Sequence, residues 1–402
     1  MNIDPEAAFA LSQEFPVMRD VASKSSPILF YLVTEDWYFL SHRLAMARAA
    51  RRAGYQVHVA THVNSQDGAI EAEGFTLHPL AWRRGSLNPY DLFTIVRQIR
   101  GLYRRHRPDL VHHVALQPAI IGSFAAIGLP MVKLNALAGL GYGFTSRGVK
   151  ARLIRPLLAT LLRWLLNKPG AAILVQNPDD RAAMAALGID EDRTFLIPGS
   201  GVDIDALRPM PEPQGPITAA FVGRLLYDKG LRALIAAYDL LVARGVKLRL
   251  LIAGESDVAN PASIPQHEIE SWKRRPGLIL LGHVGDIGAV WAQAHIAVLP
   301  SRREGLPKSL LEAAACGRPI VATNVPGCRE IARQNLNALL VPPDDPPALA
   351  EALAELVRNG ELRRLFGAAG RKLVEGEFSD IRIGQDVVAL YDRLLGRKRQ
   401  PR

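Results

Sequence analysis

The chain alternates short runs of β-branched and aliphatic residues with longer amphipathic stretches, and this alternation restricts its fold more than any other feature. Runs such as 27–33 and 109–115 have the length and composition of buried strands, whereas 39–53 and 90–107 have helical periodicity. Strands that alternate with helices form parallel sheets covered by helices on both faces. The sequence therefore predicts an α/β fold of doubly wound sheets.

The pattern occurs twice, on either side of a proline-rich segment at 208–216 in which neither a helix nor a central strand can continue. The expected strands are 27–33, 56–63, 75–80, 109–115, 131–136, 171–177 and 194–197, then 217–222, 247–253, 278–281, 295–300, 319–323 and 338–341. The other expected helices are 178–187, 231–244, 287–293, 308–315 and 347–358. We expect two Rossmann-like domains that face each other across a cleft, with ligands beyond the carboxyl ends of the strands.

The domain boundaries follow from the same pattern. We expect an N-terminal domain over 1–205, a C-terminal domain over 206–380 and a last segment over 381–402. That last segment is expected to form a helix that packs back on the N-terminal domain, followed by a basic tail.

The composition excludes several classes of protein. The two cysteines, Cys316 and Cys328, cannot form a disulfide framework, and no Cys/His group has zinc-ligand spacing. No stretch reaches the ~18 apolar residues of a membrane-spanning helix, and the acids Glu6 and Glu14 argue against a signal peptide. We therefore expect a protein of a reducing cytoplasm.

The positive charge of the chain is concentrated in one region. Residues 83–168 contain fourteen Lys or Arg and two acids, Asp91 and Asp109, whereas the net charge of the whole chain is +10. Nucleic-acid-binding motifs are missing from this region, which leaves an anionic membrane or substrate, or simply solvated helix faces. The segment 147–168, with cations first and then many leucines and Trp164, fits a helix in a membrane interface or a helix with its apolar side in the core.

Two cations occupy a loop between a strand and a helix in the second half. Arg224 and Lys229 follow the strand at 217–222 and precede the helix at 231–244. Because the N-terminus of a helix carries partial positive charge, this arrangement favours binding of a diphosphate. The alternative is two solvated loop cations.

A stronger signal lies in the segment 299–317, where a strand leads into a loop and a helix. Glu304 precedes the helix and Glu312, eight positions later, lies in its first turns. The backbone N–H groups around 305–309 form a candidate anion site, and a carboxylate beyond it can accept hydrogen bonds from ribose hydroxyls. The alternative is that Glu304 only interacts with the helix dipole and Glu312 is a surface acid.

The pair Glu304 and Glu312 resembles the E-x7-E motif of retaining glycosyltransferases with the two-domain GT-B fold, specifically family 4. Several other segments resemble the same family in the same order, namely 197–203, 223–230, 253–255, 281–284, 319–327 and 340–343. The resemblance covers most of 195–380 and is one of pattern rather than motif in the first half.

The resemblance implies a role for each residue of this donor site. Arg224 and Lys229 would hold the diphosphate of a nucleotide sugar, most simply a UDP-sugar, and Glu304 would contact the transferred sugar. Gly305 and Leu306 would supply backbone donors, Glu312 would bind the ribose, and the turn at His283 and Val284 would border the base. Glu304, Arg224 and Lys229 would be the catalytic residues.

The first domain would bind the acceptor, a lipid-linked or growing saccharide. The segment 34–43 takes the place of the family's glycine-rich loop, and its Ser41, His42 and Arg43 are acceptor-binding candidates, although Ser41 could instead cap a helix. The strand 109–115 resembles the family's histidine-containing strand in part, because Val114 stands where a histidine is expected; the adjacent His113 is the candidate catalytic histidine. Gly139 and Tyr142 could border the sugar.

The resemblance implies a retaining glycosyltransferase, which we expect to be metal-independent and to act in bacterial-type surface polysaccharide assembly. The basic region adds the expectation that it is peripheral on the inner face of the cell membrane. The two DxD-like pairs, Asp203 with Asp205 and Asp190 with Asp192, read as turns rather than metal ligands, so we expect no metal and no cofactor besides the donor. The alternatives are a nucleotide-sugar 2-epimerase and a non-catalytic nucleotide-sugar-binding protein. No nucleic-acid partner is expected.

Overall fold

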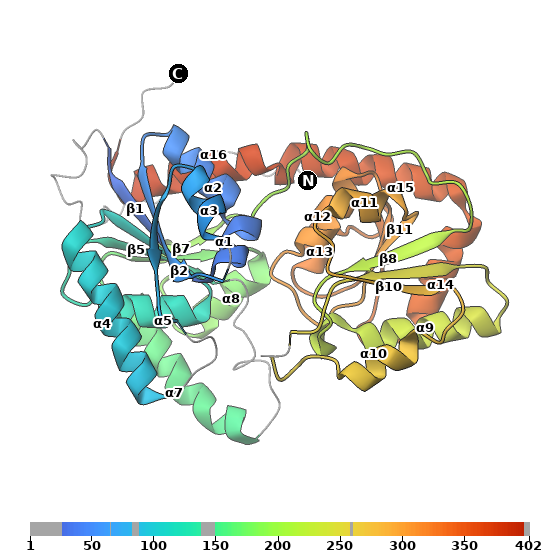
Figure 1. Ribbon diagram of the computed structural model, residues 1–402, viewed down its shortest axis with the longest axis horizontal. Coiled ribbons are helices and arrows are strands. Elements are labelled where there is room, and N and C mark those ends of the chain that lie inside the picture. Colours follow the sequence, from blue (N-terminus) through green and yellow to red (C-terminus); the bar gives the residue numbers. More distant parts are fainter. Residues whose placement is uncertain (1–25, 65, 83–87, 138–148, 258–259, 398–402) are drawn as a thin grey trace. The chain divides into compact units, whose positions relative to one another are not determined.

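The chain consists of two compact units, 1–197 together with 384–402, and 198–383 (Figure 1). The computed structural model describes residues 26–64, 66–82, 88–137, 149–257 and 260–397, except for the side chains of 149–155. Each unit contains one parallel sheet with helices on both faces. The prediction of two doubly wound α/β domains is confirmed.

Unit 1 contains a parallel sheet in the order β3-β2-β1-β4-β5-β6-β7. Its strands are β1 (Ile28–Glu35), β2 (Gln56–His62), β3 (Thr76–Pro79), β4 (Leu110–Val114), β5 (Val132–Leu137), β6 (Ala171–Val175) and β7 (Thr194–Leu196). Its helices are α1 (Asp36–His42), α2 (Leu44–Arg52), α3 (Asp67–Ala72), α4 (Pro89–His106), α5 (Leu116–Ala125), α7 (Val149–Leu166), α8 (Pro178–Ala186) and most of α16 (Asp380–Leu394). The order of the strands reverses between β1 and β4.

Unit 2 contains a parallel sheet in the order β10-β9-β8-β11-β12-β13. Its strands are β8 (Thr218–Val222), β9 (Arg249–Ala253), β10 (Leu278–Gly282), β11 (Ile296–Leu299), β12 (Ile320–Thr323) and β13 (Ala338–Val341). Its helices are α9 (Leu231–Ala243), α10 (Gln266–Trp272), α11 (Ile287–Ala292), α12 (Lys308–Ala315), α13 (Cys328–Ile331), α14 (Pro346–Arg358) and α15 (Gly360–Leu373). Here the strand order reverses between β8 and β11.

Every expected strand is present, and the differences concern helices. The expected helix 39–53 is two helices, because the chain breaks at Arg43, whose φ of −127° is not helical. The segment 34–43, read as a loop, is the end of β1 followed by α1. Helix α5 escaped prediction because most of its residues are apolar and buried, so it has no amphipathic periodicity.

The proline-rich segment belongs to unit 2, and the division between the units falls earlier, after Ile197. The Met210 N–H donates to the Cys316 carbonyl at 3.2 Å. Arg318 donates to the carbonyl of Pro211 at 3.0 Å, and Arg363 pairs with Glu212 at 2.7 Å. These contacts hold the segment against α12 and α15 instead of leaving it as a free linker.

The C-terminal part of α16 packs on unit 1 through buried hydroxyl groups. The Tyr391 hydroxyl lies 2.8 Å from that of Tyr31 and 2.6 Å from Nδ1 of His112. The Tyr55 hydroxyl donates to Asp392 at 2.7 Å. Since these partners lie on β1, on β4 and just before β2, α16 covers the sheet near the point where its strand order reverses.

Helix α7 buries one apolar side and exposes another. Leu162 and Leu166 are buried against Ile173 and Val175 of β6. Leu157 and Trp164, by contrast, are 72% and 49% exposed. Within the described ranges, every helix falls short of the length and apolar character needed to cross a bilayer.

Two helical glycines provide a test of how tightly α15 packs. A Cβ on Gly367 would overlap the carbonyl oxygen of Gly317 after α12, whereas a Cβ on Gly101 of α4 would meet nothing within 4 Å. We expect Gly367→Ala to destabilise the protein by ~2 kcal/mol or more through overpacking. Gly101→Ala should instead stabilise it by up to ~1 kcal/mol through helix propensity. Urea unfolding of both variants measures the signs, and equal effects would contradict this packing.

Candidate functional site

The candidate site of unit 2 lies where the strand order reverses. Strand β9 follows β8 on one side, while β11 pairs with β8 on the other, so the loops after β8 and β11 leave the sheet in opposite directions. The crevice between two such loops is the usual ligand site of an open parallel sheet. The loop after β8 carries Arg224 and Lys229, and the loop after β11 carries Glu304.

Lys229 and Glu304 form an ion pair in this crevice. The Lys229 ammonium lies 2.5 Å from Oε1 of Glu304, and the Ser301 hydroxyl donates to the same oxygen at 2.6 Å. Both side chains are mostly shielded from solvent, at 23% and 11% exposure. Among the described residues, none donates a hydrogen bond to Oε2 of Glu304, so this oxygen can accept one from a ligand hydroxyl.

Two glycines bring the loops close enough for this ion pair. Gly230, with φ of 72°, lies so close to the carbonyl of Pro300 that any Cβ would overlap it. Gly327, with φ of 78°, faces the carbonyls of Glu304 and Gly305, and a Cβ there would lie 2.5 Å from both. The close approach of the neighbouring backbone therefore requires glycine at both positions.

Arg224 is oriented by a carboxylate from the next loop. Its guanidinium donates to Asp257, after β9, at 2.9 Å, while 43% of the Arg224 side chain remains exposed. An exposed guanidinium held in place by one partner retains donors for a second anion. Arg224 and Lys229 thus supply positive charge on the same loop.

Glu312 is buried inside α12, not a surface acid. It is 8% exposed, and burial raises its pKa to about 7, which the nearby Lys308 ammonium at 3.7 Å only partly offsets. The first turn of α12 begins at Lys308, after Gly305 and Leu306; Leu306 packs against the core of the unit. A carboxyl group that titrates near neutrality can either donate or accept a hydrogen bond.

The turn after β10 is tied to the turn after β9. The backbone N–H of His283 donates to the Glu255 carboxylate at 3.2 Å. Val284 packs against the core, whereas the His283 ring is exposed. This turn lies at the same carboxyl edge of the sheet as the loops described above.

The predicted acceptor residues of unit 1 differ in their exposure. Ser41 and His42 are half-buried on α1; their Oγ and Nδ1 lie 2.6 Å apart, and the His42 ring stacks on Tyr38. Ser41 lies near the C-terminal end of the helix, so it is not an N-cap. Arg43 is 2% exposed and donates to the carbonyl of His42. This burial leaves Arg43 little surface for a ligand, and its assignment to acceptor binding stays a prediction.

His113 has no exposed ring nitrogen. Its Nε2 lies 3.0 Å from the Tyr103 hydroxyl and its Nδ1 lies 2.9 Å from Oδ1 of Asn135. Burial lowers the pKa of His113 to about 4. Both ring nitrogens of His113 are engaged by protein groups in this arrangement, so its catalytic role stays a prediction that these contacts do not favour.

The remaining predicted residues lie outside the described ranges or in turns. Gly139 and Tyr142 lie outside the described residues. Oδ1 of Asp203 accepts from the N–H groups of Asp205 and Ala206, as expected for a turn. Asp190 pairs with Arg193 at 3.2 Å.

Sequence reasoning missed three polar residues of the site: Ser301, Asp257 and Thr323. Thr323, at the end of β12, donates to the Ser301 carbonyl and so fixes the loop that carries Glu304. Ser301 is in the motif segment and lies three positions before Glu304, which was the available signal. Asp257 is remote in sequence from Arg224 and lies outside the motif segments, so it carried no such signal. Thr323 lies in the motif segment 319–327, but nothing in that segment indicates its contact with Ser301.

Both units match models of known domains. Residues 28–177 match the model described as "Glycosyl transferase 4-like", and residues 216–359 match "Glycosyl transferases group 1". The chain belongs with the GT4-like glycosyltransferases of the GT-B fold.

Relatives of this glycosyltransferase align over nearly the whole chain. It is 24% identical to the capsular polysaccharide biosynthesis glycosyltransferase CapM of Staphylococcus aureus, over 91% of this chain and 97% of that protein. It is also 24% identical to the N,N'-diacetylbacillosaminyl-diphospho-undecaprenol alpha-1,3-N-acetylgalactosaminyltransferase of Campylobacter jejuni, over 89% and 98%. The relatives are transferases, so the epimerase alternative is not favoured.

A solved structure has the same fold. The structure of Anabaena Alr3699/HepE in complex with UDP-glucose superposes with a TM-score of 0.73, at 15% identity, and covers 91% of this chain and 99% of that one. At this identity, the likeness concerns the fold of the glycosyltransferase.

The raised pKa of Glu312 predicts a pH dependence of stability. Because the folded protein holds this proton more tightly than the unfolded chain, the group stabilises the fold below about pH 4.5, and this stabilisation is lost as pH rises through about 7. Glu312→Gln keeps the neutral shape, so relative to wild type it should gain ~2–4 kcal/mol between pH 5 and pH 8. Urea unfolding at both pH values measures this difference. The matched control is the exposed Glu355→Gln on α14, and equal gains in both variants would contradict the burial argument.

Proposed function

We propose that this protein is a retaining glycosyltransferase that transfers a sugar from a UDP-sugar to a lipid-linked or growing saccharide. The reaction would serve the assembly of a bacterial surface polysaccharide. The observation that carries the proposal is the Lys229–Glu304 ion pair between the loops after β8 and β11, with one carboxylate oxygen available to a ligand. Retention of configuration rests on the resemblance of Glu304 and Glu312 to the E-x7-E motif.

The donor would bind at the carboxyl edge of the unit 2 sheet. Arg224 and Lys229 would hold the diphosphate and neutralise the charge that develops on the leaving nucleotide, a role that electrostatic preorganisation makes effective. A bound diphosphate would draw Lys229 away from Glu304 and leave that carboxylate to the sugar hydroxyls. Gly305 and Leu306 would lie beside the sugar.

The nucleoside would be held by Glu312 and by the turn at His283 and Val284. Glu312 would accept hydrogen bonds from the ribose hydroxyls, which favour its ionised form. Because Arg224 and Lys229 supply positive charge, we propose that transfer needs no metal ion and no cofactor besides the donor. The Anabaena protein, solved in complex with UDP-glucose, supports UDP as the nucleotide, and the name of the Campylobacter relative supports a lipid-linked acceptor.

The proposal predicts a large effect of Glu304→Gln. This substitution keeps the shape of the side chain and removes its charge, so turnover should fall by ~10²-fold or more, the scale for one preorganised electrostatic group. UDP-, GDP- and ADP-sugars are first screened for binding to wild type and for slow hydrolysis by it. The reaction rate with the donor that it accepts is then compared between wild type and the variant. Glu355→Gln is the matched control and should behave as wild type.

Measuring the affinity for UDP, which lacks the sugar, tests the contact of the loop after β8 with the diphosphate separately from any contact with the sugar. Lys229→Ala should lose ~1.5–3 kcal/mol of affinity for UDP itself, the contribution of a charge-assisted bond. Normal transfer by a folded Glu304→Gln variant, or unchanged UDP affinity in Lys229→Ala, would overturn the assignment of this site.

We also propose peripheral attachment to the inner, anionic face of the cell membrane through unit 1. Helices α4 and α7 lie on either side of α5, which both contact (Figure 1). The exposed Leu157 and Trp164 of α7 accompany the cation Arg163 on the same helix and Lys168 just after it, and the Lys168 ammonium lies 3.9 Å from the Trp164 ring centre. Cations attract anionic lipid, and exposed apolar side chains add insertion that salt does not remove.

Flotation with liposomes tests this attachment. Wild type should float far more with anionic than with neutral liposomes, and high salt should release only part of the bound protein. Leu157→Ser should reduce the salt-resistant fraction, because this side chain is 72% exposed. Leu365→Ser on α15, 60% exposed in unit 2, is the matched control. If wild type ignores anionic liposomes even at low salt, a soluble acceptor becomes the better proposal.

A further inference from the structure

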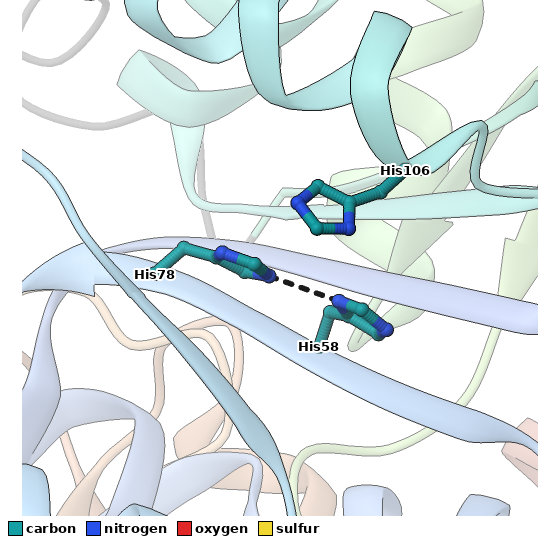
Figure 2. A group of neighbouring side chains, drawn as sticks. All are labelled: His58, His78 and His106. Atoms are coloured by element: carbon teal, nitrogen blue, oxygen red, sulfur yellow. Dashed lines mark hydrogen bonds between the residues drawn. The ribbon is translucent and has the colours of Figure 1, made fainter.

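Three histidines of unit 1, distant in sequence, meet at one edge of its sheet. His58 lies on β2, His78 on the edge strand β3, and His106 is the last residue of α4. One ring nitrogen of each lies within 4.8 Å of the others. Figure 2 shows the His106 ring approaching from the helix toward the two rings on the strands.

The backbone fixes two of these rings on one face. In the parallel register, Thr76 pairs with His58 and Leu77 with Val59, which places His78 opposite Ala60. Side chains two positions apart share a face of a strand, so His58 and His78 are diagonal neighbours. Nδ1 of His58 and Nε2 of His78 are hydrogen-bonded at 2.9 Å (Figure 2).

The surroundings disfavour the protonated form of all three rings. His58 is 8% exposed, and Phe30 stacks on both His58 and His78 at 5.2 and 5.0 Å. Burial lowers the pKa of all three histidines, to about 4 for His78, and the nearby Arg105 guanidinium lowers those of His78 and His106 further. Neutral imidazole is the form that binds metal ions.

We propose that His58, His78 and His106 form a binding site for a borderline divalent metal ion such as Zn²⁺. Three imidazole nitrogens with no carboxylate or thiolate among them suit Zn²⁺, Ni²⁺ or Cu²⁺ rather than Mg²⁺ or Ca²⁺, which prefer oxygen. His78 and His106 are only partly buried, so water can complete a tetrahedral set. The ion would join β2, β3 and the end of α4.

The geometry requires only small movements. Zinc–nitrogen bonds of about 2.0–2.1 Å place neighbouring tetrahedral ligand atoms about 3.3 Å apart. The nitrogens of His58 and His78 at 2.9 Å must separate slightly, and His106 must approach. The proton now shared between His58 and His78 moves to the other nitrogen of its ring, so this pair can bind the ion without net loss of a proton.

Titration of the full-length, tag-free protein with ZnCl₂ after removal of metal by EDTA tests the proposal. We expect one equivalent of Zn²⁺ to bind by calorimetry, with no binding of Mg²⁺ and a higher melting temperature in the presence of Zn²⁺. His106→Gln should weaken Zn²⁺ binding at least ~10-fold and abolish the thermal shift, as loss of a ligand does. The exposed His267→Gln on α10 is the matched control and should bind as wild type.

A second variant separates ligand loss from damage to the fold. His106→Cys supplies a different metal ligand and should restore binding, with a cobalt–thiolate absorption band when Co²⁺ is the probe. No bound Zn²⁺ in wild type, or equal binding by wild type and His106→Gln, would overturn the proposal, as would His106→Cys binding no better than His106→Gln. Sugar transfer in EDTA is a separate readout, so the metal site and the proposed function can fail independently.

Discussion

The structure depends on one topological constraint: each parallel sheet must reverse its strand order once. In unit 2 the reversal lies between β8 and β11, and the two loops that diverge there carry Lys229 and Glu304. These residues are 75 positions apart in sequence, yet their side chains pair because Gly230 lets the chain pass close to Pro300. The site is therefore a consequence of the connectivity, and the side chains only use the crevice that it creates.

The electrostatic arrangement of that crevice is balanced without a ligand. Arg224 contacts Asp257, Lys229 contacts Glu304, and Glu312 sits beside Lys308 with a pKa near neutrality. An anionic ligand would replace carboxylates as the partner of the cations, so binding exchanges ion pairs rather than creating charge in a shielded place. The same exchange would release Glu304 at the moment when a sugar arrives beside it.

The sequence was sufficient to predict the strands and those site residues that lie in a recognisable motif directly after a strand. Strand composition and turn residues identified every strand, and Glu304 and Glu312 stood out because their spacing spans one helix start. The sequence was insufficient for residues whose role is set by tertiary contacts. The contacts of Asp257 and Thr323 have no signal in the sequence, and Arg43 and His113 look functional but are buried. Helix α5 lacks periodicity because most of its residues are apolar and buried.

The three histidines of unit 1 are a candidate site that the sequence alone does not reveal. Metal motifs are recognised by short spacings, whereas His58, His78 and His106 are separated by whole strands and a helix, and only the β2–β3 register and the end of α4 unite them. Their chemistry also differs from that of the candidate site in unit 2: imidazole nitrogens favour a borderline metal ion, while Arg224 and Lys229 favour an anion. The proposed metal-independent transfer in unit 2 is therefore compatible with a metal ion bound in unit 1. Loss of activity in a chelator is therefore the wrong assay for the histidine site, and direct binding is the right one.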